Sequence, residues 1–458
     1  MKLIFRGHED RYAVEQSLLA FFPEERPVYE PAEDGEDHAL VTLSRSPRYN
    51  TAVTTITYHG RTARGISRTA VDPQLTEYEA ERLRQKAVKL SFFKAAREIT
   101  GITPSWGALT GIRPGKLASR MLEEGMTERQ VDRVLRDTYF VSPERRRLCI
   151  ETAEASRRAK AELKPEDISL YVGIPFCPTR CAYCSFVSQS VERTLGLVEP
   201  YLEVLHREIT DAARMVQETG LHIKSFYMGG GTPTTLSADQ MDRLLTHLNR
   251  SFDLSGCVEY CIEAGRPDTI DREKLQVLLD HGVDRISVNP QSLEDHVLTA
   301  IGRRHTARDV EEAMALATGM GFPHVNMDLI AGLPEDTPEG FRRTLDKCLS
   351  YGADNITVHT LSLKKGSRIL LENFTIPSAE AVGEMLDYAN AALRQADFHP
   401  YYLYRQKYMS GSFENVGWSR PGGECWYNVD IMSELCSILS FGAGGSTKMV
   451  EPGTNHIE

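Results

Sequence analysis

Several features that mark particular classes of protein are absent from this sequence. No run of 18 apolar residues occurs, so the sequence predicts no transmembrane helix. The opening MKLIFRGHEDRYA has only a short apolar patch before charges begin, which is not the pattern of a signal peptide. Acidic residues outnumber lysine and arginine, and the net charge of −11 argues against a general nucleic-acid-binding protein. We therefore expect neither a membrane nor a nucleic acid as partner.

Cysteine is sparse but concentrated. Nine cysteines, an odd number, without a secretory signal fit a reducing cytoplasm and favour metal or redox use over a disulfide framework. Cys177, Cys181 and Cys184 lie in YVGIPFCPTRCAYCSF with C-x3-C-x2-C spacing, directly after a strand-like run. A structural zinc site needs a fourth ligand, and no second pair follows at zinc-finger spacing. Three thiolates suit a four-iron cluster with one iron open to a small molecule; unrelated buried cysteines are the alternative.

The composition is that of a soluble globular protein large enough for two or three domains. Residues 1–75 are predicted to be β-rich, with strands in ALVTLSRS and TAVTTITYHG. Residues 76–165 have helical periodicity and end in a linker at AELKPED. Residues 166–376 alternate strands and helices, and residues 377–458 add a long helix and a strand or loop extension.

The alternating region predicts an α/β fold. Its six expected strands are SLYVGIP, KSFYMGG, VEYCIEAG, RISVNPQS, HVNMDLIAG and NITVHTLS. Amphipathic segments between them imply a parallel sheet, for which a partial (β/α)6 barrel and a doubly wound sheet are the two candidates. In either architecture the chemistry belongs at the carboxyl ends of the strands.

Polar and glycine residues gather at those strand ends. Gly229-Gly230-Gly231-Thr232 exposes backbone groups and lets a ligand approach closely, although such a run is often only a tight turn. It is not a Walker A loop, because no Gly-Lys-Ser/Thr follows. Glu263 ends the third strand and is either a hydrogen-bond acceptor for a ribose or a surface acid before a turn.

The later strand ends carry further polar groups. Ser287, Asn289 and Gln291 alternate, so on a strand they share one face and need polar partners. Asp328 is a lone acid in an apolar strand, which favours a site residue. His359 is interpreted as a core histidine. Cations suited to carboxylates follow the fourth and sixth strands, although those after the fourth are equally explained as solvated cations after a helix: Arg303, Arg304, Lys364, Lys365 and Arg368.

Three other features have ordinary structural alternatives. Arg113 and Lys116 flank a Pro-Gly turn that either holds an anion or is a solvated helix start. The tyrosines of PYYLY are interpreted as a strand with an aromatic face. Cys425, in PGGECWYN, is assigned to a loop, whereas most other isolated cysteines are expected to be small core residues.

Taken together, these motifs resemble the radical S-adenosylmethionine (SAM) enzymes. The resemblance extends to their coproporphyrinogen III dehydrogenase-like, HemZ-type branch and covers about residues 168–450. It rests on six motifs that occur in order: YVGIPFCPTRCAYC, MGGGTPT, CIEAGRP, SVNPQSL, GRRHTA and NMDLIAGLPEDT. It implies a partial barrel, a [4Fe-4S] cluster and SAM as cofactors, and, from the family's usual length, a C-terminal segment missing after EPGTNHIE.

The resemblance also implies roles for individual residues. Cys177, Cys181 and Cys184 each hold one iron of the cluster, and SAM chelates the fourth. Tyr171 lies close to cluster and cofactor, and it is implied, with Arg303 and Asp328, to be catalytic. The other implied cofactor-binding residues are Tyr183, Gly230, Gly231, Thr232, Glu263 and Gln291.

The implied reaction begins with cleavage of SAM to methionine and a 5′-deoxyadenosyl radical. That radical takes hydrogen from a propionate of coproporphyrinogen III, whose oxidative decarboxylation leads to protoporphyrinogen IX, with flavodoxin or ferredoxin as electron donor. Two positions depart from the branch's dehydrogenases, which carry Cys at Phe186 and His at Gly173. The alternatives are therefore a haem-binding or haem-delivery protein on the same scaffold, and a radical enzyme with another substrate.

Overall fold

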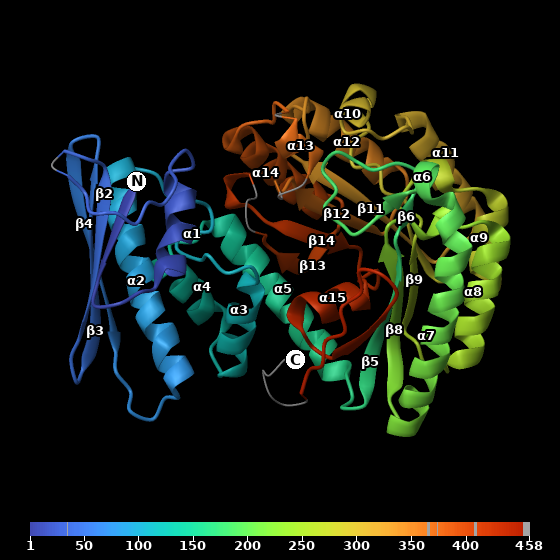
Figure 1. Cartoon of the computed structure of the whole chain (residues 1–458), viewed down its shortest axis with the longest axis horizontal. Coiled ribbons are helices and arrows are strands. Elements are labelled where there is room, and N and C mark those ends of the chain that lie inside the picture. Colours follow the sequence, from blue (N-terminus) through green and yellow to red (C-terminus); the bar gives the residue numbers. More distant parts are fainter. Residues whose placement is uncertain (34, 364–366, 373, 407–409, 452–458) are drawn as a thin grey trace. The chain divides into compact units, whose positions relative to one another are not determined.

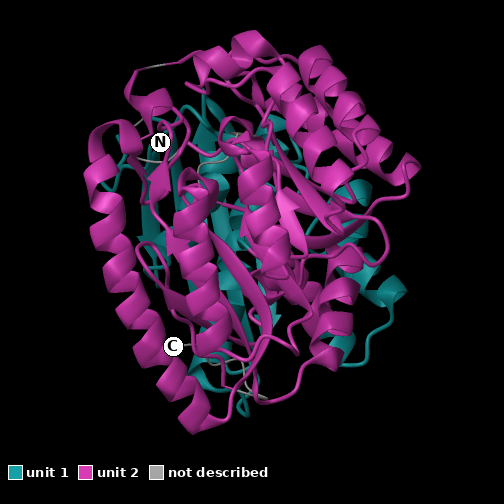
Figure 2. Ribbon diagram, turned by 90° about the vertical axis from the view of Figure 1, so that its right-hand side faces the viewer, with its two compact units in different colours: residues 1–112, 121–148 teal, residues 113–120, 149–458 magenta. Residues whose placement is uncertain are grey.

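The computed structural model describes residues 1–33, 35–363, 367–372, 374–406 and 410–451 (Figure 1). The chain divides into two compact units, Met1–Ile112 with Met121–Leu148, and Arg113–Arg120 with Cys149–Glu458 (Figure 2). Helices α3 (Pro114–Glu123) and α5 (Pro143–Glu162) each contribute residues to both units. The predicted divisions at 75, 165 and 376 follow changes of structure type and stay a prediction of domain boundaries.

The first unit is a four-stranded sheet with helices. Its strands, in the order β1-β2-β3-β4, are Lys2–Arg6, His38–Arg45, Tyr49–Tyr58 and Arg61–Ala70; β1 and β2 are parallel and the others antiparallel. The long helix α2 (Glu77–Thr100) packs closely on the sheet, where Thr54 and Ser91 share a buried hydrogen bond of 2.8 Å. Helices α1 (Arg11–Phe21) and α4 (Glu128–Asp137) complete it. The two predicted strands are confirmed as β2 and β3, but α1, β1 and β4 were not predicted.

The second unit contains a nine-stranded sheet in the order β13-β14-β12-β11-β10-β9-β8-β5-β15. The six predicted strands are confirmed as neighbours in one parallel array: β5 (Asp167–Ile174), β8 (His222–Gly230), β9 (Glu259–Glu263), β10 (Arg285–Ser287), β11 (His324–Ala331) and β12 (Asn355–Thr360). β15 (Ser437–Phe441) adds a parallel strand beside β5, and antiparallel β14 (Asn415–Ser419) and β13 (His399–Tyr404) extend the other end. The aromatic PYYLY segment is therefore a strand, as predicted.

The sheet curves around a short helix, α15 (Trp426–Ser433). α15 contacts both β8 and β13, which lie far apart in the strand order (Figure 1). Tyrosines from β13 share an apolar core with Tyr427 of α15 and Ile438 of β15. Because both ends of the sheet contact the same core, the strands form an open barrel with its concave side filled by α15.

Helices connect the parallel strands on the convex side of the sheet. The longer ones are α7 (Val198–Thr219), α8 (Ala238–Ser251), α9 (Arg272–Asp280), α11 (Ala307–Met320), α12 (Pro338–Ser350) and α14 (Ala379–Gln395). Several begin at the expected polar caps: the Ser237 and Thr306 side chains each accept from the backbone N–H three residues on. The short elements are β6 (Phe176–Cys177), β7 (Gln189–Ser190), α6 (Val191–Thr194), α10 (Asp295–Ala300) and α13 (Arg368–Leu371).

The Pro-Gly turn at Arg113 and Lys116 is occupied by the chain's own carboxylate. Glu434 forms ion pairs with both cations, and its Oε1 lies 3.8 Å from Lys448 Nζ. Burial alone would raise the pKa of Glu434, but the hydrogen bond and charges of these cations hold it below its ordinary value. The turn does bind an anion, but that anion is internal to this unit.

Candidate functional site

The three clustered cysteines lie on one loop at the carboxyl end of β5. The loop is closed where β6 pairs with β7, through Phe176 and Gln189. Ala182, between two of the cysteines, is buried, and its N–H donates to Ile301 O at 2.9 Å. Cys181 is buried, whereas Cys177 and Cys184 are partly exposed. The loop is thus anchored to the barrel rim while two of its thiols remain accessible.

The donor set fits an iron–sulfur cluster better than a single ion. Within the described residues, no three Cys, His, Asp or Glu side chains converge on one metal position. The thiolates that hold a cluster bind different irons, so they need to surround a larger group rather than a point. Burial raises the pKa values of the Cys177 and Cys184 thiols, and the charge of Cys181 raises both further. A bound metal cluster supplies the positive charge that reverses this repulsion.

The glycine turn after β8 lies directly against the cysteine loop. The N–H of Gly231 donates to Ile174 O at 2.8 Å, and that of Thr232 donates to Phe176 O at 2.7 Å. A Cβ on Gly231 would lie 2.6 Å from Phe176 O, so only glycine fits. Thr232 Oγ1 also donates to Cys177 Sγ at 3.6 Å. Two N–H groups of the turn therefore hold the cysteine loop in place.

Two carboxylates, Glu263 of β9 and Asp328 of β11, interact electrostatically across the intervening strand β10. Tyr227 donates to Glu263 Oε1 at 2.5 Å. Burial raises the pKa of Glu263 to about 7, with a further contribution from the charge of Asp328. Burial alone would raise the pKa of Asp328 too, but its electrostatic interaction with His359 and the hydrogen bond that it accepts from Asn326 Nδ2 at 2.8 Å hold it below its ordinary value. The two acids therefore differ in protonation near neutral pH.

His359 belongs to this polar group, and its interpretation as a core histidine is wrong. Its side chain is partly exposed, its Nε2 lies 3.8 Å from Asp328 Oδ2, and its Nδ1 lies 3.5 Å from the Tyr404 hydroxyl. β11 and β12 run parallel, so their ends bring the two side chains to one edge of the sheet. Sequence reasoning did not connect them because the partners are about thirty residues apart.

Ser287, Asn289 and Gln291 do not share one strand face as predicted, because only Ser287 belongs to β10. β10 ends at Ser287, and the chain turns through Pro290, which has no N–H for the ladder. Gln291 then adopts a left-handed φ of 66°, and its N–H donates to Asp328 O at 2.9 Å. Ser287 Oγ and Gln291 Oε1 are buried without a hydrogen-bond partner in the described part of the chain. Buried polar atoms are normally hydrogen-bonded, so these two atoms mark a place where a polar ligand fits.

Arg303 is a buried cation beside the cysteine loop. Its Nη1 donates to the carbonyl of Asn289 at 2.7 Å, and its Nη2 donates to the Tyr183 hydroxyl at 3.0 Å. Burial disfavours its charge, but Tyr183 and Cys181 keep its pKa above the ordinary value. Its Nε has no partner in the described structure. The side chain thus connects the cysteine loop to the turn that carries Gln291.

Three stacked tyrosines line the concave side below these groups. Tyr171 of β5 stacks on Tyr227 at a centroid distance of 6.3 Å, and Tyr227 stacks on Tyr427 at 4.5 Å. A Cβ on Gly230 would lie 3.1 Å from the Tyr171 hydroxyl, so Tyr171 also reaches the glycine turn. Burial raises the pKa of Tyr171. Tyr227 and Tyr427 were not predicted as site residues; the position of Tyr227, two before Gly229, was the available signal.

The other predicted cations differ in their surroundings. Arg304 is exposed and pairs with Glu192, and Arg368 pairs with Glu372 at 2.8 Å. Lys364 and Lys365 lie outside the described residues. Cys425 lies in a loop, as predicted, just before α15; it is buried, and its thiol donates to Glu259 Oε1 at 3.1 Å. Arg303 is therefore the predicted cation that the structure places within the buried site.

Gly173 has a close neighbour that explains the missing side chain. A Cβ at this position would lie 2.6 Å from the carbonyl oxygen of Ala443, in the glycine turn after β15. Tyr201 holds both segments: its hydroxyl donates to Gly173 O at 2.5 Å and accepts from Ala443 N at 2.9 Å. The glycine turn of FGAGG therefore occupies the space that a histidine would need.

We expect Gly173→His to destabilise the protein by about 1–3 kcal/mol, because the imidazole must displace the Ala443 carbonyl from a closely packed contact. The free energy of unfolding from denaturant titration measures the effect. Gly256→His is the matched control, since no atom lies within 4 Å of its Cβ position. Equal free energies of unfolding for the two variants would show that the turn after β15 moves to admit the imidazole without loss of stability, and would contradict this expectation.

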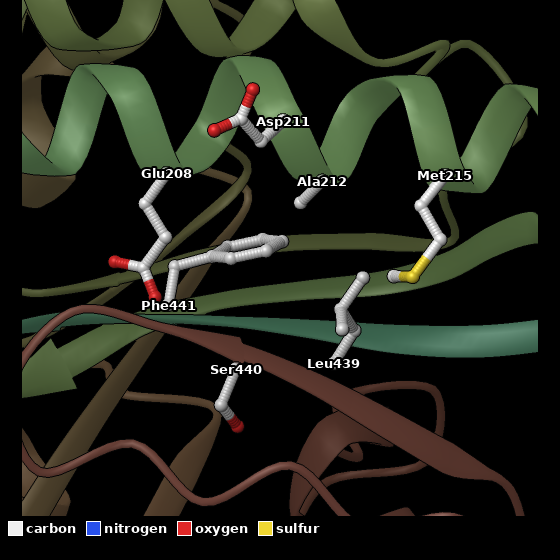
Figure 3. Close-up of a pocket in the computed structure, with 7 residues that line it drawn as sticks. All are labelled: Glu208, Asp211, Ala212, Met215, Leu439, Ser440 and Phe441. Atoms are coloured by element: carbon white, nitrogen blue, oxygen red, sulfur yellow. The ribbon is translucent and has the colours of Figure 1, made fainter.

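A separate hollow of about 380 Å³ lies between α7 and β15 (Figure 3). Glu208, Asp211 and Met215 line it from the helix, and Leu439 and Phe441 line it from the strand (Figure 3). The Oε2 of Glu208 accepts from Gly442 N at 2.9 Å, which fixes the glycine turn to α7. None of the predicted site residues lines this hollow, so it is not the site at the strand ends.

Comparison with known proteins agrees with this geometry. Residues 171–348 match the model of the radical SAM superfamily. The chain is 39% identical to the oxygen-independent coproporphyrinogen-III oxidase-like protein HemZ of Bacillus subtilis, over 84% of this chain and 78% of that protein. The chain belongs to the radical SAM superfamily, in its HemZ-type, coproporphyrinogen oxidase-like branch. This superfamily uses a [4Fe-4S] cluster and SAM.

Two further relatives mark the range of activities in the branch. The haem chaperone HemW of Bacillus subtilis is 30% identical over 62% of this chain and 73% of that protein. The solved structure of coproporphyrinogen III oxidase (HemN) from Escherichia coli, a radical SAM enzyme, matches with a TM-score of 0.53 and 25% identity, covering 65% of this chain and 68% of that one. None of the described helices is long and apolar enough to cross a membrane.

Proposed function

We propose that this chain catalyses the oxidative decarboxylation of a tetrapyrrole propionate, with coproporphyrinogen III as substrate and protoporphyrinogen IX as product. The observation that carries the proposal is the position of the cysteine loop above buried, unpartnered polar atoms at the strand ends. The similarity to HemZ and to the HemN structure supports the substrate class. When bound, the cluster and SAM supply a 5′-deoxyadenosyl radical able to take hydrogen from an unactivated carbon.

The residues around the loop have distinct proposed tasks. Cys177, Cys181 and Cys184 hold the cluster, and Gln291 Oε1 and Glu263 hold the polar part of SAM. Arg303 fixes the loop relative to the turn at Gln291, and Asp328 provides the ionised carboxylate of the pocket. Tyr171 and its stacked partners form an apolar wall below the cofactor, which limits access of water to the reacting atoms. Tyr183 orients Arg303.

The substrate's carboxylates are proposed to bind at the exposed rim. Arg304 and Arg368 pair there with carboxylates of the chain, and an incoming propionate replaces those partners. Phe186 and Val187, each 67% exposed, begin two residues after Cys184 and offer apolar contact to a macrocycle. An electron donor such as flavodoxin or ferredoxin is required to reduce the cluster.

A second candidate function is haem binding and delivery. It is favoured by the similarity to HemW and by the exposed apolar pair Phe186 and Val187 next to the cysteine loop. Both functions use the same rim, but only the enzyme consumes SAM in proportion to a substrate. The two candidates therefore separate in one set of measurements.

Anaerobic incubation of the reconstituted protein with coproporphyrinogen III, SAM, a reductant and a one-electron acceptor is expected to yield a vinyl-bearing product, because the propionate radical left by hydrogen abstraction loses carbon dioxide and passes one electron to that acceptor. Chromatography of the oxidised porphyrins measures it, and a parallel haem titration monitors the Soret band. Tight haem binding without any vinyl product would favour the delivery function and contradict the proposed reaction.

A further inference from the structure

Arg266 lies on the buried side of the cysteine loop. The residue is only 2% exposed, and its Nη1 donates to the Cys181 Sγ at 3.7 Å and to the Thr179 carbonyl at 3.3 Å. Its Nη2 donates to Thr179 Oγ1 at 3.0 Å. The guanidinium therefore contacts a thiol of the loop and the backbone two residues before it. Nothing in the predicted site included this residue.

The position of the guanidinium is fixed by a second set of contacts. Its Nε and Nη2 bind Asp268 at 3.1 and 3.2 Å, which makes a two-bond ion pair. His305 faces the same carboxylate at 3.9 Å, and burial lowers the pKa of His305, so the imidazole is neutral near pH 7. Asp268 offsets part of the charge of Arg266 through this direct ion pair. The N–H directed at Cys181 nevertheless remains in contact with the sulfur.

Cys177 and Cys181 differ in the hydrogen bonds that their thiols accept. Cys177 Sγ accepts from the neutral hydroxyl of Thr232 at 3.6 Å, whereas Cys181 Sγ accepts from an N–H of the Arg266 guanidinium at 3.7 Å. The Arg303 guanidinium also lies near Cys181 and interacts with its charge. Cys181 therefore lies next to two buried guanidinium groups, those of Arg266 and Arg303.

We infer that Arg266 is a positioning residue that sets the reduction potential of the cluster through its N–H contact with Cys181. Reduction adds negative charge to the cluster and its thiolates, and an N–H from a cation stabilises that added charge. The potential is therefore less negative with Arg266 than without it. The inference rests on the proposed ligation by Cys177, Cys181 and Cys184, and it adds a control on how readily the cluster accepts an electron.

The test compares Arg266→Gln and Arg266→Lys in the full reconstituted chain. The midpoint potential is measured by a redox titration followed by electron paramagnetic resonance, together with iron content. We expect a shift to a more negative potential in the Gln variant and a smaller shift of the same sign in the Lys variant, which keeps the charge but loses the two-bond geometry. Arg193→Gln, which removes an exposed cation from the segment after the loop, should leave the potential unchanged.

Each outcome decides a different claim. An unchanged midpoint potential in both Arg266 variants, with or without a fall in iron content, overturns the inference and leaves Arg266 a structural anchor. If the Gln variant holds no cluster, the midpoint potential of the Lys variant decides the inference: a more negative value supports it, and any other value overturns it. A wrong ligand assignment gives a different result, because Cys181→Ala would then retain its iron. In that case the proposed ligation fails, whatever the potentials of the Arg266 variants. A more negative midpoint potential in the Arg266 variants, together with loss of iron in Cys181→Ala, supports both the role of Arg266 and the ligand assignment.

Discussion

A Cys181→Ala variant is expected to lose the iron–sulfur cluster and all SAM cleavage. Cys181 is the buried member of the three thiols, and guanidinium groups surround it. Alanine leaves an iron without its thiolate, and the neighbouring cations then lose the negative charge that they face. The expected result after anaerobic reconstitution is iron and sulfide at background and no visible absorption from a cluster.

Cys348→Ala is the matched control for this loss. Cys348 lies buried in α12, outside the cysteine loop, and burial raises the pKa of its thiol, as expected of an inert core cysteine. Its replacement should leave iron content unchanged. Wild-type iron content in Cys181→Ala, with normal folding by circular dichroism, would contradict the proposed ligands.

Glu263→Gln is expected to weaken SAM binding at pH 8 by about ten- to a hundredfold, the worth of a buried hydrogen bond to a charged group. One carboxylate oxygen accepts from Tyr227, and the other has no hydrogen-bond partner in the described part of the chain. Burial raises the pKa of this acid to about 7, so the ionised acceptor is lost as pH falls through 7. Wild-type affinity should therefore decline from pH 8 to pH 6, and the Gln variant should show no such decline. Anaerobic equilibrium dialysis with labelled SAM measures both.

The stability of this variant separates binding from folding. The native pKa of Glu263 lies above its ordinary value of 4.5, so the folded state binds more protons and its stability falls as pH rises from about 4.5 to 7. The Gln variant should accordingly resist heat at pH 8 at least as well as the wild type. Asp430→Asn is the control: burial also raises its pKa to about 7, but it contacts Ser169 near the amino end of β5. A similar loss of SAM affinity in Asp430→Asn would mean that Glu263 has no special role.

The parallel core of the fold was predictable because its signals are local. Each of the six strands has an apolar run with a glycine or polar residue at its end, and amphipathic helices separate them. Short right-handed connections then place consecutive strands side by side, so β5 through β12 follow from their order. The cysteine loop was predictable for a similar reason, since its three thiols lie within one short segment.

The parts that were not predicted depend on contacts between distant segments. β15 pairs in parallel with β5, more than 260 residues earlier, and nothing local in SILSF indicates that partner. Tyr427 reaches the site because α15 fills the concave side of the sheet, and Arg266 reaches Cys181 from a turn after β9. Tertiary packing of this kind leaves no periodic signal in the sequence.

The departure at Gly173 shows how such a contact changes an interpretation. In the sequence it is a missing histidine, which weakens the assignment of the reaction. In the structure it is a contact surface, because the carbonyl of Ala443 and the hydroxyl of Tyr201 occupy its surroundings. The glycine is therefore explained by packing against the turn after β15, and substrate handling must fall to other residues at the rim.

The fate of one hydrogen atom tests the central claim most directly. Coproporphyrinogen III carrying deuterium at the propionate carbon next to the ring is incubated anaerobically with the reconstituted protein, SAM and reductant, and 5′-deoxyadenosine is examined by mass spectrometry. The account predicts deuterium in 5′-deoxyadenosine, in proportion to the vinyl product, with none of either in Cys181→Ala. Unlabelled 5′-deoxyadenosine from a protein with an intact cluster would show that the radical acts elsewhere and would contradict the proposed reaction.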